Sequence, residues 1–149
     1  MSVIHNKYLL LFLRIIMGLI FIYSGIQKIS DPRGFGIAIE NYRIFPFFII
    51  NFLAITIPWL ELITGMFLLF GILLKESSSI INVLLFLFII LLVSALIRKL
   101  DIDCGCFGTF DNQKVGLKKL LENTFLFVIG FYIYKTANKQ SFTIPYKND

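Results

Sequence analysis

Charged side chains are scarce in this sequence. Asp, Glu, Lys and Arg together make up 15% of its 149 residues, against about 25% in an average soluble domain. Hydrophobic residues make up 58% and the mean hydropathy is +0.85, so water could not solvate the surface that such a chain would present. The low charge therefore excludes an ordinary soluble domain, and the sequence predicts an integral membrane protein.

Histidine and cysteine are also rare, with one histidine, His5, and two cysteines, Cys104 and Cys106. Two cysteines cannot build the disulfide framework of a small secreted domain. A structural zinc site takes four ligands, and His5 is predicted on the side of the membrane opposite the cysteines. The leading prediction therefore contains no metal site.

The long apolar runs predict an all-α membrane protein with a single domain, residues 1–149. Four runs predict membrane-spanning helices at about residues 8–29, 47–74, 79–97 and 120–134, because a helix of about 20 residues crosses the hydrocarbon core. Residues 35–42 predict a short interfacial helix in the first loop, residues 75–78 a turn, and residues 135–149 a polar tail. The expected fold is a four-helix transmembrane bundle.

The basic residues bear on orientation rather than on nucleic-acid binding, since they lie between the apolar runs and suit anionic lipid headgroups. Four spans put both termini on one side of the bilayer and the cysteines on the other. The cysteine side has eight basic residues and the opposite side five. The eight are Lys28, Arg33, Arg43, Arg98, Lys99, Lys114, Lys118 and Lys119, and the five are Lys7, Lys75, Lys135, Lys139 and Lys147. By the positive-inside rule this count favours a cytoplasmic cysteine loop.

Both cysteines lie in the stretch Asp101-Ile102-Asp103-Cys104-Gly105-Cys106-Phe107-Gly108. A disulfide across one residue closes a tight ring, away from relaxed geometry, and strain makes a disulfide easier to reduce. Gly105 allows the backbone to bend as closure requires. We predict a catalytic redox pair, with two alternatives: small buried apolar side chains or soft-metal binding.

Polar residues within the spans are the second group of candidates. Arg14, Gly18, Phe21, Gly25 and Lys28 fall on one stripe of the first helix. Glu61 lies in the middle of the second run, where an ionised carboxylate costs at least a few kcal/mol. It must be protonated, paired with Arg14 or Lys28, or exposed to a cavity.

Two functions are open for this polar group besides a purely structural ion pair: a proton relay through Glu61, and contacts to a bound cofactor. Tyr23 and Trp59 flank the region as interfacial anchors, as core residues or as walls of a quinone pocket. The predicted cofactor-binding residues are Arg14, Lys28, Glu61 and Trp59, and the candidate cofactor is a quinone.

These motifs resemble the MauE-type, methylamine-utilisation branch of the DoxX-like membrane proteins. The resemblance covers about residues 8 to 130. Its fragments are Leu13-Arg14 with Gly18 and Phe21, Tyr23-Ser24-Gly25-Ile26-Gln27-Lys28 with Asp31-Pro32, Asn41-Tyr42-Arg43, Pro58-Trp59-Leu60-Glu61-Leu62 with Gly65, and the cysteine stretch.

The resemblance implies a four-helix protein of the bacterial inner membrane that takes part in thiol and disulfide metabolism. It implies a thioredoxin-like partner, maturation of a disulfide-rich periplasmic enzyme subunit, and a periplasmic cysteine face, which disagrees with the charge count.

Three functions follow as hypotheses. The first is a thiol–disulfide oxidoreductase in which Cys104 and Cys106 exchange electrons with that partner, coupled to a quinone. The alternative is a non-enzymatic membrane subunit whose cysteine loop docks a partner or binds a soft metal. The third, a transporter or proton path, depends on Glu61 alone.

Overall fold

The computed structural model describes residues 2–105 and 114–140. They form five helices: α1 (Ser2–Ser30), α2 (Pro32–Asn41), α3 (Phe47–Phe70), α4 (Leu74–Ile97) and α5 (Leu117–Gln140). Within these residues there is no strand, only an isolated antiparallel bridge between Asp103 and Lys114. The prediction of an all-helical chain is confirmed for this part.

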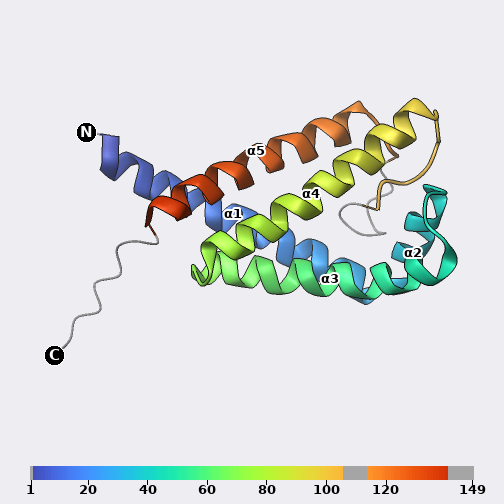
Figure 1. Cartoon of the computed structure of the whole chain (residues 1–149), viewed down its shortest axis with the longest axis horizontal. Helices are drawn as coiled ribbons and strands as arrows, with labels where there is room; N and C mark the ends of the chain where they lie inside the picture. The colour runs from blue at the N-terminus through green and yellow to red at the C-terminus, as the bar shows by residue number, and fades with distance from the viewer. Residues whose placement is uncertain (1, 106–113, 141–149) are drawn as a thin grey trace.

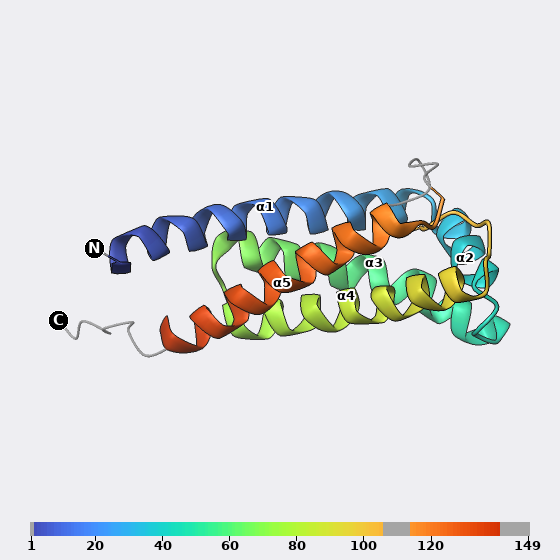
Figure 2. The ribbon, with the colours of Figure 1, turned by 90° about the horizontal axis from the view of Figure 1, so that it is seen from above.

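The four long helices run alongside one another, and α2 closes one end (Figures 1 and 2). α1 packs antiparallel along α3, and α4 packs antiparallel along α5. The segment that follows α4 passes beside α2, so the described part of the cysteine loop lies at that end (Figure 1). We call it the cysteine end.

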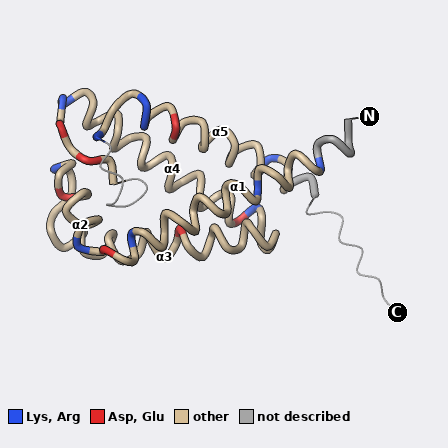
Figure 3. Tube along the Cα trace, turned by 180° about the vertical axis from the view of Figure 1, so that it is seen from behind, with Lys and Arg blue, Asp and Glu red and all other residues tan. Residues whose placement is uncertain are grey.

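Three helical stretches are long and apolar enough to cross a membrane: Lys7–Ser30, Phe47–Phe70 and Leu74–Ile97. Charged residues gather mainly at the cysteine end and are sparse along the middle of the helices (Figure 3). Large apolar side chains such as Phe52, Val83 and Phe125 are exposed along the outer faces, as expected of surfaces that contact lipid. The protein is therefore an integral membrane protein.

The fourth predicted span coincides with α5, which has the same length as α3 and α4, 24 residues. α5 is not among the three apolar stretches, since Lys118, Lys119, Glu122 and Asn123 lie in its first turns. The structure thus supports three spans by length and composition, and the fourth span stays a prediction.

The break between α1 and α2 lies at Asp31, between the first predicted span and the predicted interfacial helix. The Asp31 carboxylate accepts a hydrogen bond of 2.9 Å from the backbone N–H of Gly34, and Pro32 takes the first helical position. Both features favour the start of a helix. α2 therefore begins three residues earlier than the interfacial helix that we expected.

The turn predicted at residues 75–78 is wrong. α3 ends at Phe70, and α4 begins at Leu74, so those residues form its first turns. Gly71 ends α3 with φ 78°, a left-handed conformation that glycine adopts at little cost, and Leu73 is also left-handed. Ser77 and Ser78 are buried, and the Ser78 hydroxyl donates to the Leu74 carbonyl at 2.6 Å.

Residues 135–140, assigned to the polar tail, belong to α5, and residues 141–149 lie outside the described residues.

Small residues allow α1 and α3 to approach closely. A side chain at Gly25 would meet the backbone of Pro58 and Leu62 at 2.9 Å, and one at Gly65 would meet the Gly18 carbonyl at 3.0 Å. Such contacts are typical of membrane helix pairs. Gly18 and Gly25, on the predicted stripe of the first helix, therefore lie directly against α3.

Candidate functional site

A buried ion pair joins α1 and α3 near the cysteine end. Lys28 Nζ lies 2.7 Å from Glu61 Oε1 and 2.9 Å from Glu61 Oε2. Lys28 Nζ donates to Ser24 Oγ at 3.1 Å, and the Ser24 hydroxyl donates to Glu61 Oε2 at 3.1 Å. Lys28 is 0% and Glu61 2% exposed. Of the two predicted partners of Glu61, Arg14 and Lys28, it is Lys28 that forms the ion pair.

Two aromatic rings complete the surroundings of the ammonium group. Lys28 Nζ lies 4.9 Å from the ring centroid of Phe35, on α2, and 4.8 Å from that of Phe88, on α4. Cations are attracted to the faces of aromatic rings at such distances. The ion pair is therefore enclosed by residues from α1, α2, α3 and α4.

Cys104 belongs to the hydrophobic cluster that contains Phe35 and Phe88. It is 4% exposed and disulfide-bonded, and Cys106, the only other cysteine of the sequence, lies outside the described residues together with Phe107 and Gly108. The described part of the loop thus lies at the same end as Lys28 and the first loop, as predicted.

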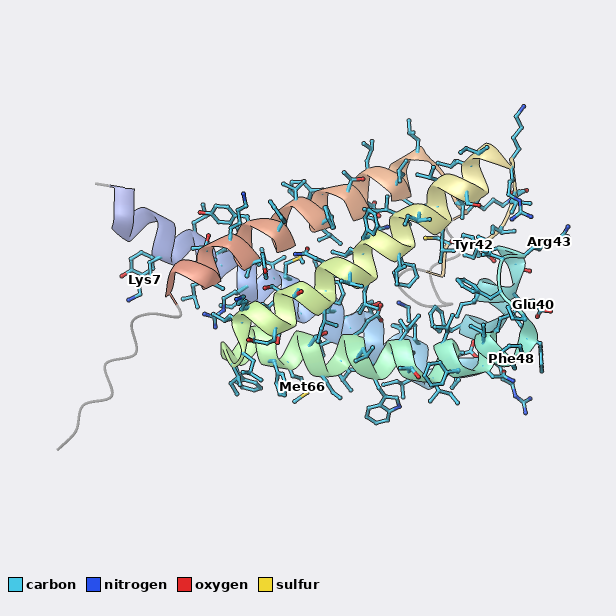
Figure 4. The ribbon with its side chains drawn as sticks, viewed as in Figure 1. Lys7, Glu40, Tyr42, Arg43, Phe48 and Met66 are labelled. Atoms are coloured by element: carbon cyan, nitrogen blue, oxygen red, sulfur yellow. The ribbon has the colours of Figure 1, made fainter. Side chains whose placement is uncertain are left out.

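Tyr42 holds the backbone of the cysteine loop. Its hydroxyl donates a hydrogen bond of 2.8 Å to the carbonyl oxygen of Cys104, and its own carbonyl accepts one of 2.6 Å from Arg98 Nη1. Burial raises the pKa of Tyr42 to about 12, so the phenol stays protonated and able to donate at neutral pH. Tyr42 points inward, whereas Glu40 and Arg43 point away (Figure 4).

Gly105 fits tightly against α2. Its φ is 64°, and a Cβ there would lie 2.7 Å from the Cβ of Ala38. Glycine is therefore required for both conformation and space. The two described ends of the loop meet where Val115 N–H donates to the Ile102 carbonyl at 2.8 Å.

An exposed ion pair also links the loop ends, with Lys114 Nζ 2.8 Å from Asp101 Oδ2. The hydrogen bond to Asp101 and its negative charge raise the pKa of Lys114. Asp101 therefore faces a lysine at the surface of the loop.

Arg14 and Trp59 lie away from the ion pair. Arg14 donates to the carbonyls of Leu68 at 3.2 Å and Leu69 at 3.5 Å, near the end of α3, and fourteen residues of helix separate it from Lys28, about 21 Å. Trp59 is 52% exposed on the outer face of α3. Of the four predicted cofactor-binding residues, Lys28 and Glu61 thus form a close pair, Arg14 lies far along α1, and Trp59 is exposed on the outer face of α3.

An apolar groove of about 640 Å³ lies between α1 and α5 and includes Tyr23. It is lined by Ile16, Leu19, Ile20, Tyr23, Glu122, Phe125, Leu126 and Ile129. In the described part of the chain, no group of three or more histidine, cysteine, aspartate or glutamate residues could hold a metal ion.

The contacts of Tyr42, Arg98, Phe35 and Phe88 were not predicted from the sequence. Tyr42 entered only as part of a family fragment, and 62 residues separate it from Cys104. The two phenylalanines are among 17 in the chain, and no pattern distinguishes them. The polar hydroxyl of Tyr42, in the polar stretch with Asn41 and Arg43, was the one feature of the sequence that could have indicated a hydrogen-bonding role.

The ion pair and the cysteine loop both lie in a part of the chain that matches a known protein family. Residues 6–135 match the family described as Methylamine utilisation protein MauE. No curated protein and no solved structure matched the chain. The match covers most of the sequence, including the Lys28–Glu61 ion pair and the cysteine loop. The chain therefore belongs to the MauE family of membrane proteins involved in methylamine utilisation.

Proposed function

We propose that this protein is a thiol–disulfide redox protein, in which Cys104 and Cys106 exchange electrons with a thioredoxin-like partner. The observation that carries the proposal is the disulfide-bonded state of Cys104 in a short loop whose backbone is held by Tyr42. A fixed loop presents the same bond to each partner molecule, which favours exchange with a specific protein. The biological role is disulfide formation or maturation of extracytoplasmic proteins.

This role sets the proposed topology. α5 crosses the bilayer as the fourth span, supported by its length and its packing along α4. The cysteine end faces the periplasm from a bacterial inner membrane, because protein disulfides are formed and used outside the cytoplasm. This orientation opposes the count of basic residues, so it requires a direct test of sidedness.

A quinone is the proposed electron carrier in the lipid phase, but the four residues predicted to hold it do not form one pocket. Lys28 and Glu61 are packed on all sides, Arg14 bonds to carbonyls near the end of α3, and Trp59 is exposed on the outer face of α3. A headgroup could reach Lys28 only by displacing its neighbours, Phe35 or Phe88. We therefore derive no quinone step from these residues.

Trapping of a mixed disulfide tests the exchange. Membranes that contain the protein are mixed with a thioredoxin-like protein whose second active-site cysteine is replaced by serine, so that the adduct cannot resolve. We expect a covalent adduct that reducing agent releases. The Cys104→Ser/Cys106→Ser variant is the matched control and should give none.

Growth on methylamine gives the second test. Loss of growth in the Cys104→Ser/Cys106→Ser strain, with normal amounts of the protein in the membrane, is expected. Normal growth together with absence of the adduct would refute the proposal.

The alternative is a non-enzymatic subunit whose cysteine loop is a docking element, and the burial of Cys104 favours it, because structural disulfides are commonly buried. A redox titration separates the two functions. A pair that is oxidised and reduced reversibly supports the redox protein, whereas a pair that stays oxidised, or that binds copper or zinc stoichiometrically after reduction, supports the alternative.

A further inference from the structure

We propose that the groove between α1 and α5 binds an isoprenoid quinone, with Tyr23 and Glu122 at its ring and the apolar walls along its tail. The assignment rests on the proposed function, which requires an electron carrier in the lipid phase. It concerns the binding of this carrier alone, and its residues differ from the four that were predicted as cofactor contacts.

The groove is accessible from the lipid. α1 and α5 separate toward the cysteine end (Figure 1), and the groove between them has a volume of about 640 Å³. Small-molecule sites typically have volumes of about 300–1,000 Å³. Leu19 on one wall and Phe125 on the other are 53% and 66% exposed on the outer surface. A molecule dissolved in the bilayer can therefore enter without passing through water.

Polar residues lie at one end of this groove only. α1 runs toward the cysteine end and α5 begins there (Figure 2). Tyr23, the last lining residue of α1, and Glu122, the first of α5, therefore share the end nearer the cysteine loop. The remaining lining residues are all apolar: Ile16, Leu19, Ile20, Phe125, Leu126 and Ile129. This distribution suits a molecule with a polar ring and an apolar tail, whereas a plain acyl chain would use neither polar group.

Tyr23 and Glu122 also match the chemistry of a quinone ring. A phenol hydroxyl can donate to a quinone carbonyl oxygen, and a carboxylate can accept from the hydroxyl of the reduced ring. Glu122 Oε2 lies 3.2 Å from Lys119 Nζ, and the Glu122 side chain is still 39% exposed. Phe125, one helical turn beyond Glu122, offers an aromatic face for stacking. Both oxidation states of the ring thus find a partner at this end.

The polar end of the groove adjoins the surroundings of Cys104. Leu120, two residues before Glu122, packs against the hydrophobic cluster that contains Cys104. A second groove of about 350 Å³ lies between α4 and α5. Its polar residues include Ser79, near the start of α4, and Tyr134, toward the end of α5, so they lie away from the cysteine end. The groove between α1 and α5 is therefore the one that suits a carrier for the cysteine pair.

Photolabelling of the full-length protein in nanodiscs tests this site. The probe is a benzoquinone with an alkyl tail and an aryl azide, and labelled peptides are mapped by mass spectrometry. We expect the label on the lining residues of α1 and α5. Unlabelled decyl-benzoquinone should compete with the probe, and decylbenzene, which has the same tail but no oxygens, should not. Label spread evenly over the outer faces of all helices, or equal competition by decylbenzene, would overturn the proposal.

Two pairs of variants distinguish this groove from the rest of the lipid-facing surface. Leu19→Trp should abolish labelling, because the indole fills the groove. Its matched control is Val83→Trp, on the wall of the second groove and 56% exposed, which should change nothing. Tyr23→Phe should weaken competition by decyl-benzoquinone roughly two- to tenfold, as the loss of one hydrogen bond does, and Tyr134→Phe is its control. An unchanged result in Leu19→Trp or Tyr23→Phe would contradict the assignment.

The outcome is independent of thiol exchange. Labelling is repeated in the Cys104→Ser/Cys106→Ser variant, where it should persist. Failure to trap a mixed disulfide would refute the proposed function and leave quinone binding unaffected. Absence of specific labelling would refute the quinone site and leave thiol exchange with the partner intact.

Discussion

The ammonium group of Lys28 lies 2.7 Å from the carboxylate of Glu61, and neither side chain is accessible from outside the protein. Ser24 bonds to both groups, and the rings of Phe35 and Phe88 cover the ammonium. An ion pair with all its partners in place can be tolerated in a low-dielectric interior, whereas either charge alone cannot. The pair therefore fixes how α1, α3, α2 and α4 meet beside the cysteine loop.

Removal of one partner of this pair should destabilise the protein strongly. Lys28→Met and Glu61→Leu each leave a charge buried and unpaired, at a cost of about 3–5 kcal/mol. The Lys28→Met/Glu61→Leu double variant should regain most of that stability. The measurement is the free energy of unfolding in mixed detergent micelles, followed by helix content.

The exposed pair of Lys114 and Asp101 is the control for these variants, with side chains 66% and 73% exposed. Asp101→Asn should leave the free energy of unfolding almost unchanged, as for most surface ion pairs. If Glu61→Leu were no more destabilising than Asp101→Asn, the ion pair would not hold the helices together.

Close contact between α1 and α3 makes Gly25 sensitive to a single methyl group. Gly25→Ala would bring a Cβ within 2.9 Å of the α3 backbone, and overpacking of this kind costs about 1–3 kcal/mol. Gly116→Ala is the matched control, because its nearest neighbour would be 3.8 Å away. Thermal unfolding in detergent measures both, and an equal effect of the two substitutions would contradict the packing described.

Arg14 should matter for stability and not for thiol exchange. Its hydrogen bonds to the Leu68 and Leu69 carbonyls lie far from Cys104, so Arg14→Met should lower stability by about 1–3 kcal/mol. The rate of exchange with glutathione should stay unchanged in the variant that remains folded. A slower exchange would instead support the predicted role of Arg14 as a cofactor-binding residue.

The titration of Tyr42 gives a prediction for high pH. Its pKa, raised by burial to about 12, lies above the value of about 10 for a tyrosine in an unfolded chain. The stabilisation from the buried neutral phenol is therefore complete below pH 10 and is lost as the pH rises from 10 towards 12. Phenolate absorbance should show one late component that Tyr42→Phe removes, and its presence in that variant would contradict the assignment.

The sequence predicted the parts of the fold that depend on apolar length and local chemistry. The long runs located α1, α3, α4 and α5, and the end of the first run, at about residue 29, lies close to the end of α1 at Ser30. The turn after α3 was wrongly predicted at the polar residues 75–78, whereas α3 ends at Gly71, which takes a left-handed conformation.

The site was predictable only where a residue is unusual for its surroundings. Glu61 and Lys28 are charges inside apolar runs, and Cys104 is one of two cysteines, so each attracted a hypothesis. Periodicity placed Arg14 and Lys28 on one stripe but could not decide between them as partners of Glu61. The contact of Tyr42 with Cys104 spans 62 residues and follows from the packing of α2, which composition does not specify.

Reduction of the disulfide of Cys104 against defined redox buffers tests the central claim most directly. The purified protein is equilibrated over a series of potentials, and free thiols are counted by the mass added by maleimide. The account predicts one reversible two-electron transition, at roughly −120 to −270 mV as in thioredoxin-like proteins, which is absent in Cys104→Ser. A disulfide that stays oxidised below about −300 mV in the folded protein, as structural disulfides do, would contradict it.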